Sequence, residues 1–246
     1  VRRILRDEDN EKIGRPSRYQ DLLPVIQGEF KRCGGNAVRV QENLRCEYGQ
    51  DVPYSTVTRL VRDMDLREDK SRKRSGSYNY EPGCEAQFDT SPHQVILNGK
   101  KITAQCAGYV LGFSRRAYIQ YYPSFTRLEA KEFIKEAQIF NDGSVLECII
   151  DNTSVVVAHG HGPKAQMAPE MESFGKIFGM TFVAHAIGHA DRKALVERLF
   201  SYVEKNFLAG RTFSGWQNLN LQARQWCIQV ANRKQKHSLG MSPAEA

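Results

Sequence analysis

The first third of the chain shows apolar residues at helical spacing. Three such stretches, 17–30, 36–46 and 54–64, are separated by turns that contain glycine or proline. Ser17 is placed to cap the first helix, although Pro24 is expected to break or kink it. The pattern predicts three short amphipathic helices.

The third helix combines an apolar side with a polar, basic one. Val57, Leu60, Val61 and Met64 recur at the spacing of an inward face. The opposite side carries the residues predicted to lie nearest a DNA duplex, namely Tyr54, Ser55, Thr58, Arg59 and Arg62. This pattern indicates a helix-turn-helix unit, although a helical bundle with a basic surface and no DNA partner remains open because fold does not fix function.

After residue 83 the pattern changes to strands. Three runs, 85–97, 102–112 and 115–122, are rich in β-branched and aromatic residues. The turn Asn98-Gly99-Lys100 separates the first two, and a short break at 112–114 separates the others. These runs predict an antiparallel meander.

The rest of the chain alternates helices with short apolar strands. The expected elements are a helix over 126–140, a buried strand over 145–150, a flexible loop over 159–164, a helix over 169–178, a strand over 180–184 and a helix over 191–207. The order β-β-β-α-β-α-β-α predicts an α/β protein with a ribonuclease-H-like, mixed five-stranded sheet and flanking helices, preceded by the helix-turn-helix domain.

These elements define five segments. We expect the end of an upstream helical DNA-binding unit at 1–14, the helix-turn-helix domain at 15–66, a basic linker at 67–83, the catalytic core at 84–208 and a helical extension of that core at 209–246.

The charge balance indicates an anionic binding partner. Lysine and arginine outnumber aspartate and glutamate by 35 to 28, a net charge of +7, and Arg72, Lys73 and Arg74 form a basic knot in the linker. Such a knot attracts phosphates through counterion release, or serves as a solvated linker. No apolar run approaches the roughly eighteen residues of a membrane span, so we expect a cytoplasmic protein with no membrane contact.

The cysteine and histidine patterns suggest no structural zinc. The six cysteines are scattered without Cys-x-x-Cys spacing, and we interpret them as reduced, buried thiols. His185 and His189 have i,i+4 spacing, but Gly188 lies between them and the glutamate of a zincin motif is missing.

Three carboxylates are placed where metal-dependent phosphoryl transfer would need them. Asp89 lies in the first strand, Asp151 closes the fourth, and Glu197 lies in the last helix of the predicted core. Two metal ions in such a site lie only about 4 Å apart, so the acids must converge from different elements. Glu85 and Gln87 share the strand face of Asp89 and are either second-layer partners or solvent-facing residues. Periodicity alone leaves Glu204, two turns beyond Glu197, as an alternative third acid.

The blocks Gln87-Phe88-Asp89, Ile150-Asp151-Asn152 and Lys193-Ala194-Leu195-Val196-Glu197 resemble the three acidic blocks of retroviral integrases and related transposases. The closest resemblance is to IstA-type DDE transposases of bacterial insertion sequences, and it favours Glu197 over Glu204. It implies two Mg²⁺ ions per active site, with Mn²⁺ as a substitute, held by Asp89, Asp151 and Glu197. Lys193 would pair with Glu197 or contact the DNA backbone.

The resemblance also implies the reaction and the partners. A DNA transposase of this kind cleaves at transposon ends and joins the 3′-hydroxyl to target DNA. Its expected partners are the terminal inverted repeats, target DNA, further copies of the chain in a synaptic complex and an AAA+ ATPase helper, in the bacterial cytoplasm and on the nucleoid. Two other functions stay open: a catalytically inactive DNA-binding or architectural protein, and a ribonuclease-H-like nuclease without strand transfer.

Overall fold

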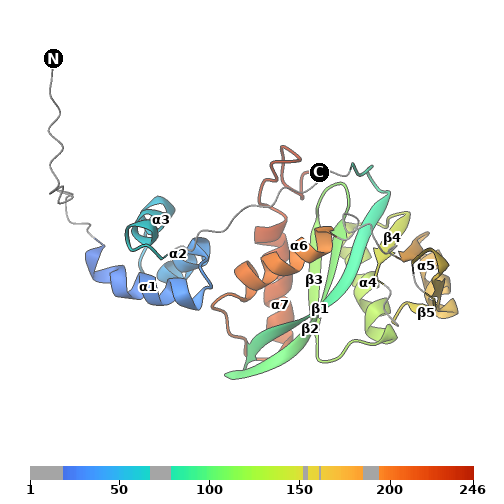
Figure 1. Ribbon diagram of the computed structural model, residues 1–246, viewed down its shortest axis with the longest axis horizontal. Helices are drawn as coiled ribbons and strands as arrows, with labels where there is room; N and C mark the ends of the chain where they lie inside the picture. Colours follow the sequence, from blue (N-terminus) through green and yellow to red (C-terminus); the bar gives the residue numbers. More distant parts are fainter. Residues whose placement is uncertain (1–18, 67–78, 152–154, 161, 185–193) are drawn as a thin grey trace, which may run out of the picture. The chain divides into compact units, whose positions relative to one another are not determined.

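The computed structural model describes residues 19–66, 79–151, 155–160, 162–184 and 194–246. The chain divides into two compact units, Val1–Asp69 and Lys70–Ala246 (Figure 1). The predicted segment 1–14, Ser17 and most of the linker lie outside the described residues.

The first unit consists of short helices around a small apolar core. A 3₁₀ turn, Gln20–Leu22, leads into α1 (Leu23–Arg32), which is followed by α2 (Ala37–Cys46) and α3 (Tyr54–Asp63). Their inward faces are fully buried at Ile26, Val40, Leu44, Val57 and Val61.

The prediction that Pro24 would break the first helix is wrong. Pro24 lies in the first turn of α1, where the backbone N–H that proline lacks would have no helical partner. At the start of α2, the Asn36 side chain accepts a hydrogen bond from the Val38 N–H at 3.0 Å, as an N-cap residue does.

The second unit is built on the predicted five-stranded sheet. Its strands are β1 (Glu85–Leu97), β2 (Lys100–Leu111), β3 (Ala117–Tyr122), β4 (Glu147–Ile150) and β7 (Thr181–Ala184). The order is β3-β2-β1-β4-β7, with β1 to β3 antiparallel and with β4 and β7 parallel to β1. This mixed sheet confirms the predicted ribonuclease-H-like class.

The turn between β1 and β2 has the backbone that its residues favour. Asn98 and Gly99 both have positive φ, 48° and 75°, which a tight hairpin turn requires and which asparagine and glycine tolerate best. The predicted Asn98-Gly99 turn is therefore confirmed.

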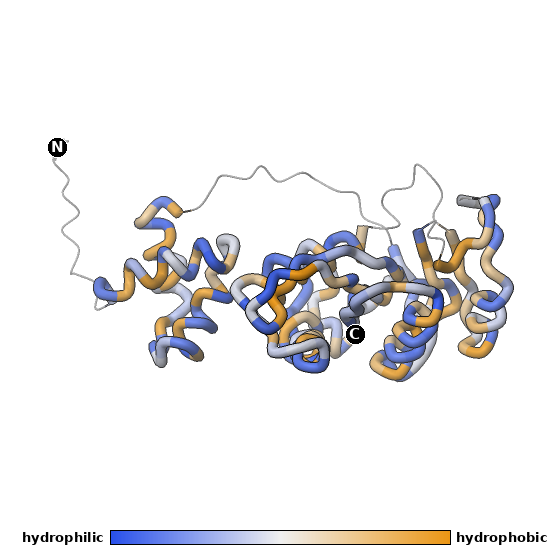
Figure 2. Tube along the Cα trace, turned by 90° about the horizontal axis from the view of Figure 1, so that it is seen from below, coloured by the Kyte–Doolittle hydropathy of each residue, from blue (hydrophilic) through white to orange (hydrophobic). Residues whose placement is uncertain are grey.

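Helices cover both faces of the sheet (Figure 1). On one face, Phe133 of α4 (Arg127–Asn141) packs on Phe88 of β1. Thr126 and Glu129 form a capping box at the start of α4. The other face carries α6 (Ala194–Tyr202) and α7 (Trp216–Trp226), while α5 (Pro169–Ile177) contacts β7. In Figure 2 the helices alternate between hydrophilic and hydrophobic stretches, as amphipathic helices do.

Two expectations differ from the structure. The expected loop over 159–164 contains a 3₁₀ turn over Gly162–Lys164, and it joins two short strands that pair with each other, β5 (Val157–His159) and β6 (Gln166–Met167). The last core helix changes from α to π geometry, with α6 followed by a π-helix over Val203–Leu208. A second π-helix, Cys227–Ala231, continues α7.

The cysteines are less uniformly buried than predicted. Cys33, Cys106, Cys148 and Cys227 are buried, Cys84 is partly buried, and Cys46 at the end of α2 is exposed. Burial raises the pKa of the Cys227 thiol to about 12, so this thiol stays protonated as a small apolar group. None of the described helices has the length and apolar character needed to cross a lipid bilayer.

Candidate active site on β1 and after β4

The pairing of β1 with β4 brings two of the predicted acids to neighbouring positions. Gln87 pairs with Ile149, and Phe88 pairs with Ile150. Asp89 directly follows Phe88, and Asp151 directly follows Ile150. Because side chains alternate along parallel strands in the same register, both aspartates start from the face of the sheet that Gln87 occupies.

Helix α6 lies on this face because β2 has a glycine beside Asp89. Gly108 pairs with Asp89, and a Cβ atom at Gly108 would lie only 2.9 Å from Cε1 of Phe200. Any larger side chain would require the side chains of Phe200 and Leu199 on α6 to move. Gly108 therefore permits the close approach of the helix that carries Glu197.

Gln87 fixes the start of this helix to the strand. Its side-chain oxygen accepts hydrogen bonds from the backbone N–H groups of Leu195 and Val196, at 3.0 and 3.2 Å. Its side-chain nitrogen donates to the hydroxyl of Tyr80 at 3.1 Å. Gln87 is only 1% exposed, so these bonds form away from water. The amide thus satisfies N–H groups that a helix start leaves without intrahelical partners.

Glu197 and Glu204 lie in different surroundings. Glu197 directly follows the anchored Val196 and is exposed. Glu204 lies in the π-helix, where its charge adds to the effect of burial in raising the pKa of Cys106 and of Tyr121. Those residues belong to β2 and β3, and Cys106 pairs with Ser91, beyond Asp89 along β1. Of the two glutamates, Glu197 is therefore the one next to the Gln87 anchor.

The donor chemistry of the two aspartates fits a hard divalent cation. Mg²⁺ prefers carboxylate oxygens, and Asp89 and Asp151 supply them from adjacent strands. Within the described parts of the chain, no three aspartate, glutamate, histidine or cysteine side chains form a group that could hold a metal ion. The structure thus brings two of the three predicted acids together, and the complete set stays a prediction.

The predicted DNA-contacting side of α3 faces solvent. Tyr54, Ser55, Arg59 and Arg62 are exposed and Thr58 is partly buried, with its hydroxyl donating to the Ser55 carbonyl at 3.0 Å. Six other predicted residues lie outside the described part of the chain: Arg72, Lys73, Arg74 and Lys193 as DNA contacts, and His185 and His189 of the rejected zinc pair.

Sequence reasoning placed Gln87 on the face of Asp89 but missed its two anchoring contacts. Tyr80 was not singled out, because only the fold shows that it meets Gln87. A Cβ at Gly112 would lie 2.5 Å from Cδ1 of Tyr80, so this glycine makes room for the tyrosine. The nearest signal in the sequence was the position of Tyr80 just before the first strand.

The curated proteins that this chain resembles are transposases of insertion sequences. The chain is 26% identical over 234 residues to a putative transposase of insertion sequence element IS5376 from Geobacillus stearothermophilus, covering 94% of this chain and 58% of that protein. It is 23% identical over 180 residues to the IS21 transposase of Pseudomonas aeruginosa, covering 73% of this chain and 46% of that protein. The chain spans about half the length of the curated relatives it matches. No protein-family model matches it.

Among solved structures, the chain is similar to the HTLV-2 integrase catalytic core domain in complex with magnesium. The two are 15% identical, the TM-score is 0.47, and the match covers 67% of this chain and 95% of that one. The strand order β3-β2-β1-β4-β7 is that of the predicted ribonuclease-H-like class, and the curated relatives are transposases of insertion sequences. The predicted resemblance to IstA-type DDE transposases is confirmed.

Proposed function

We propose that this chain is part of a DNA transposase that cleaves at transposon ends and joins the freed 3′-hydroxyl to target DNA. Asp89, Asp151 and Glu197 would be its metal-binding carboxylates. The observation that carries the proposal is the adjacent placement of Asp89 and Asp151, beneath a helix whose start Gln87 anchors beside them. The transposase relatives support a polynucleotidyl-transferase function.

The three acids would come from different elements of the fold. Asp89 and Asp151 would hold metal from the rigid sheet, and Glu197 would complete the set from α6. Two Mg²⁺ ions, or Mn²⁺ in their place, would supply Lewis acidity toward the phosphodiester and would activate the attacking hydroxyl. The chain then needs no side chain as general base, and it contributes position and negative charge.

The first unit would read the DNA. Tyr54, Ser55, Thr58, Arg59 and Arg62 on α3 would lie nearest the terminal inverted repeats, since the second helix of a helix-turn-helix pair enters the major groove. The linker 67–83 and Lys193 would contact the backbone. We also propose a multimeric complex on two transposon ends, target DNA as second substrate and an AAA+ ATPase helper, as the resemblance to IstA-type transposases implies.

The direct test is Asp151→Asn, which keeps the shape of the side chain and removes its charge. We expect loss of Mg²⁺-dependent cleavage and joining on a duplex that carries the element's terminal repeat, with affinity for that duplex retained. Asp142→Asn is the matched control, because Asp142 is an exposed aspartate at the end of α4 in a left-handed conformation that asparagine tolerates. Full joining by Asp151→Asn would refute the assignment.

The same assay separates the rival functions. A labelled end with a free 3′-hydroxyl and a supercoiled target reveal joined products for a transposase, but only cut DNA for a nuclease. An architectural protein would bind the end and leave both DNAs intact with Mg²⁺ and with Mn²⁺.

A further inference from the structure

Strands β1 and β2 run beyond the other strands of the sheet, where they form a two-stranded ribbon (Figure 1). Pairing of β1 with β4 ends at Phe88, and pairing of β2 with β3 begins only at Gln105. Eight residues (97 − 89) separate Asp89 from Leu97 at the end of the ribbon, about 26 Å at the usual rise of a strand. The ribbon therefore leads away from the candidate active site along the strand of its first acid.

The segment after the first π-helix holds the tip of the ribbon in place. The Phe213 N–H donates to the Ile96 carbonyl at 2.9 Å, and the Phe213 carbonyl accepts from the Asn98 N–H at 2.8 Å. The Phe213 side chain is buried and packs against Phe207 of the π-helix. The ribbon is thus a fixed part of the second unit.

The outer edge of β1 is open between β4 and this docked segment. Even-numbered residues of β1 direct their backbone groups to the outer edge, as the bond from Phe213 to the Ile96 carbonyl shows. Because this direction alternates along an antiparallel strand, the N–H groups of Thr90 and Gln94 point the same way. Among the described residues, none accepts a hydrogen bond from either N–H. Both are available to a ligand that lies along the edge.

Pro92 makes this edge unsuitable for a further protein strand. It is exposed and lies between Thr90 and Gln94, and it has no N–H to donate. Proline on an edge strand is one of the features that prevent strand addition. The β3 edge, by comparison, is covered by α7, where the Asn220 amide bonds the N–H and the carbonyl of Tyr121 at 2.7 and 2.9 Å.

The ribbon carries positive charge with no acid near it in the sequence. Lys100 and Lys101 at its tip are both exposed. No aspartate or glutamate occurs from residue 90 to residue 128, and none occurs from 205 to 244, which includes the segment docked on the tip. A polyanion that lies along the edge is therefore attracted to the tip.

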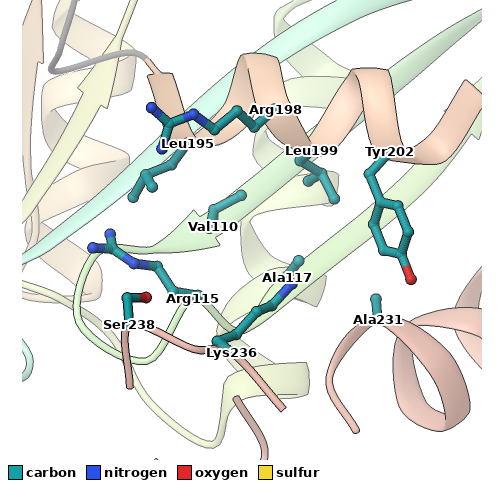
Figure 3. A pocket seen from close by; sticks show the side chains of 10 residues that line it. All are labelled: Val110, Arg115, Ala117, Leu195, Arg198, Leu199, Tyr202, Ala231, Lys236 and Ser238. Atoms are coloured by element: carbon teal, nitrogen blue, oxygen red, sulfur yellow. The ribbon is translucent and has the colours of Figure 1, made fainter. Parts of the chain in front are cut away.

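Three other cations lie at the far end of β2. Arg115, Arg198 and Lys236 surround a cavity of about 200 Å³ that Val110 also lines (Figure 3). Val110 is ten residues (110 − 100) beyond Lys100 along β2, about 33 Å at the usual rise. The cavity and the ribbon tip therefore cannot contact the same phosphate.

We infer that the outer edge of β1 and the lysines of the ribbon tip bind the backbone of target DNA, beside the phosphodiester that reacts. This contact rests on the proposed function and lies outside the three acids and outside the first unit. At 3.4 Å per base pair, the 26 Å from Asp89 to the tip corresponds to about eight base pairs, most of a helical turn.

The kind of contact favours target DNA over the transposon ends. Backbone N–H groups and lysine side chains bind phosphates, which carry no sequence information. A surface that does not read bases suits the target, because only the terminal repeats have a sequence that belongs to the element.

The first measurement is how strongly salt weakens DNA binding by the chain. The probe is a fluorescein-labelled duplex of arbitrary sequence, followed by anisotropy in EDTA. Each neutralised phosphate adds about 0.9 to the slope of log K against log salt. Between about 50 and about 200 mM salt, the wild type should therefore lose about twelve-fold more affinity than Lys100→Gln combined with Lys101→Gln, about 3.5-fold for each lysine.

Matched variants separate the tip from overall charge. Lys135→Gln makes the same change on the exposed side of α4 and should keep the wild-type slope. Lys100→Arg combined with Lys101→Arg should also keep it, because the charges remain. A reduced slope in the α4 variant equal to that of a tip variant would show that net charge, and not the ribbon, sets the salt dependence.

The second measurement separates target DNA from transposon ends. With a precut end and a supercoiled target, the double glutamine variant should need more target for half-maximal joining, in proportion to its lost affinity. Cleavage of an end with only a few flanking base pairs needs no target and should keep the wild-type rate.

A variant on the edge itself tests the path between Asp89 and the tip. Gln94→Glu puts a negative charge there, and the Thr103 hydroxyl, 2.8 Å from the Gln94 amide nitrogen, can donate to the new carboxylate. It should raise the target concentration for half-maximal joining as the tip variants do. Gln225→Glu makes the same change on the exposed side of α7 and should leave joining unchanged.

The outcomes distinguish this contact from the proposed function. Wild-type slope and joining in the tip and edge variants, beside a wild type that joins, would overturn the contact and leave the transposase. Equal loss of cleavage and joining would place the contact on the transposon end and overturn the assignment to target DNA. A wild type that neither cleaves nor joins would refute the proposed function, and the target contact with it.

Discussion

At the scale of single residues, Gln87 connects three segments at the candidate site. One buried amide joins the strand of Asp89, the start of the helix of Glu197 and the hydroxyl of Tyr80. The sequence placed Gln87 on the right face of its strand, since alternation fixes the face. The sequence alone does not identify the hydrogen-bond partners of Gln87. They depend on which helix crosses that face of the sheet and on where along the strand it crosses.

We predict that Gln87→Met, which roughly keeps the volume and removes the acceptor, impairs joining more than DNA binding. The buried Val196 N–H and the partly buried Leu195 N–H lose their partner, at a cost of about 1–3 kcal/mol for the buried group. Strand transfer and hydrogen exchange at the start of α6 are the measurements. Tyr80→Phe is the control, because it removes only the partner of the amide nitrogen. Equal joining by Gln87→Met and wild type would show that the anchor does not position Glu197.

His93 is the residue through which we expect pH to affect stability. It is 1% exposed, packs edge-on against Phe200, and its Nδ1 lies 3.1 Å from the Tyr121 hydroxyl. Burial lowers the pKa of His93 from 6.5 to about 4. The unfolded chain therefore binds a proton between these values that the folded chain does not, so the stability from this group is complete above pH 6.5 and falls toward pH 4.

The expected loss between those pH values is about 3 kcal/mol in the free energy of unfolding, from the size of the pKa shift. His93→Phe should remove this part of the pH dependence, because phenylalanine takes up no proton. The measurement is the free energy of unfolding of the wild type and of His93→Phe, from denaturant titrations at several pH values. The pH dependence that comes from carboxylates is common to both proteins and cancels in the difference. Parallel pH profiles for the two proteins would contradict the prediction.

At the level of elements, the two candidates for the third acid lie in different helices: Glu197 is in α6 and Glu204 is in the π-helix that follows it. Helical periodicity puts both on one side and cannot choose between them. Seven residues at 1.5 Å each separate them by roughly 10 Å, so only one can join Asp89 and Asp151. The anchored start of α6 lies beside Glu197, whereas Glu204 lies toward Cys106 and Tyr121.

We predict that Glu197→Gln eliminates Mg²⁺-dependent strand transfer and that Glu204→Gln retains most of it. The two substitutions are chemically identical and both sites are exposed, so each variant controls for the other. Strand transfer by the purified proteins is the measurement, with circular dichroism as a check on folding. An inactive Glu204→Gln beside an active Glu197→Gln would reverse the assignment.

Element types were more predictable than their irregularities. Alternation and turn residues predicted 85–97 as a strand, and the structure has β1 over Glu85–Leu97. The π-helices were not predictable from apolar spacing; in the first of them Asn206 accepts a hydrogen bond from the Trp226 indole of α7 at 2.6 Å. The pairing of β5 with β6 was missed because strands of three and two residues are too short to show alternation.

At the level of the whole molecule, strand order determines which distant residues meet. The β-β-β-α-β-α-β-α pattern was enough to predict the sheet and the neighbouring positions of β1 and β4. The anchoring of α6 was beyond the sequence, because Tyr80, Gln87 and Leu195 come from three segments with no common motif. Only the packing of α6 on the sheet brings these three residues together.

The crossover between β3 and β4 also has a consequence for the time at which the site forms during synthesis. Strands β1 to β3 are consecutive and can pair as soon as they leave the ribosome, since such contacts are local. Parallel pairing of β1 with β4 must wait until α4 has been made and has crossed the sheet. A nascent chain therefore carries Asp89 without its neighbour, and we expect nuclease chemistry to be absent until translation has passed Asp151 and the helix beyond it.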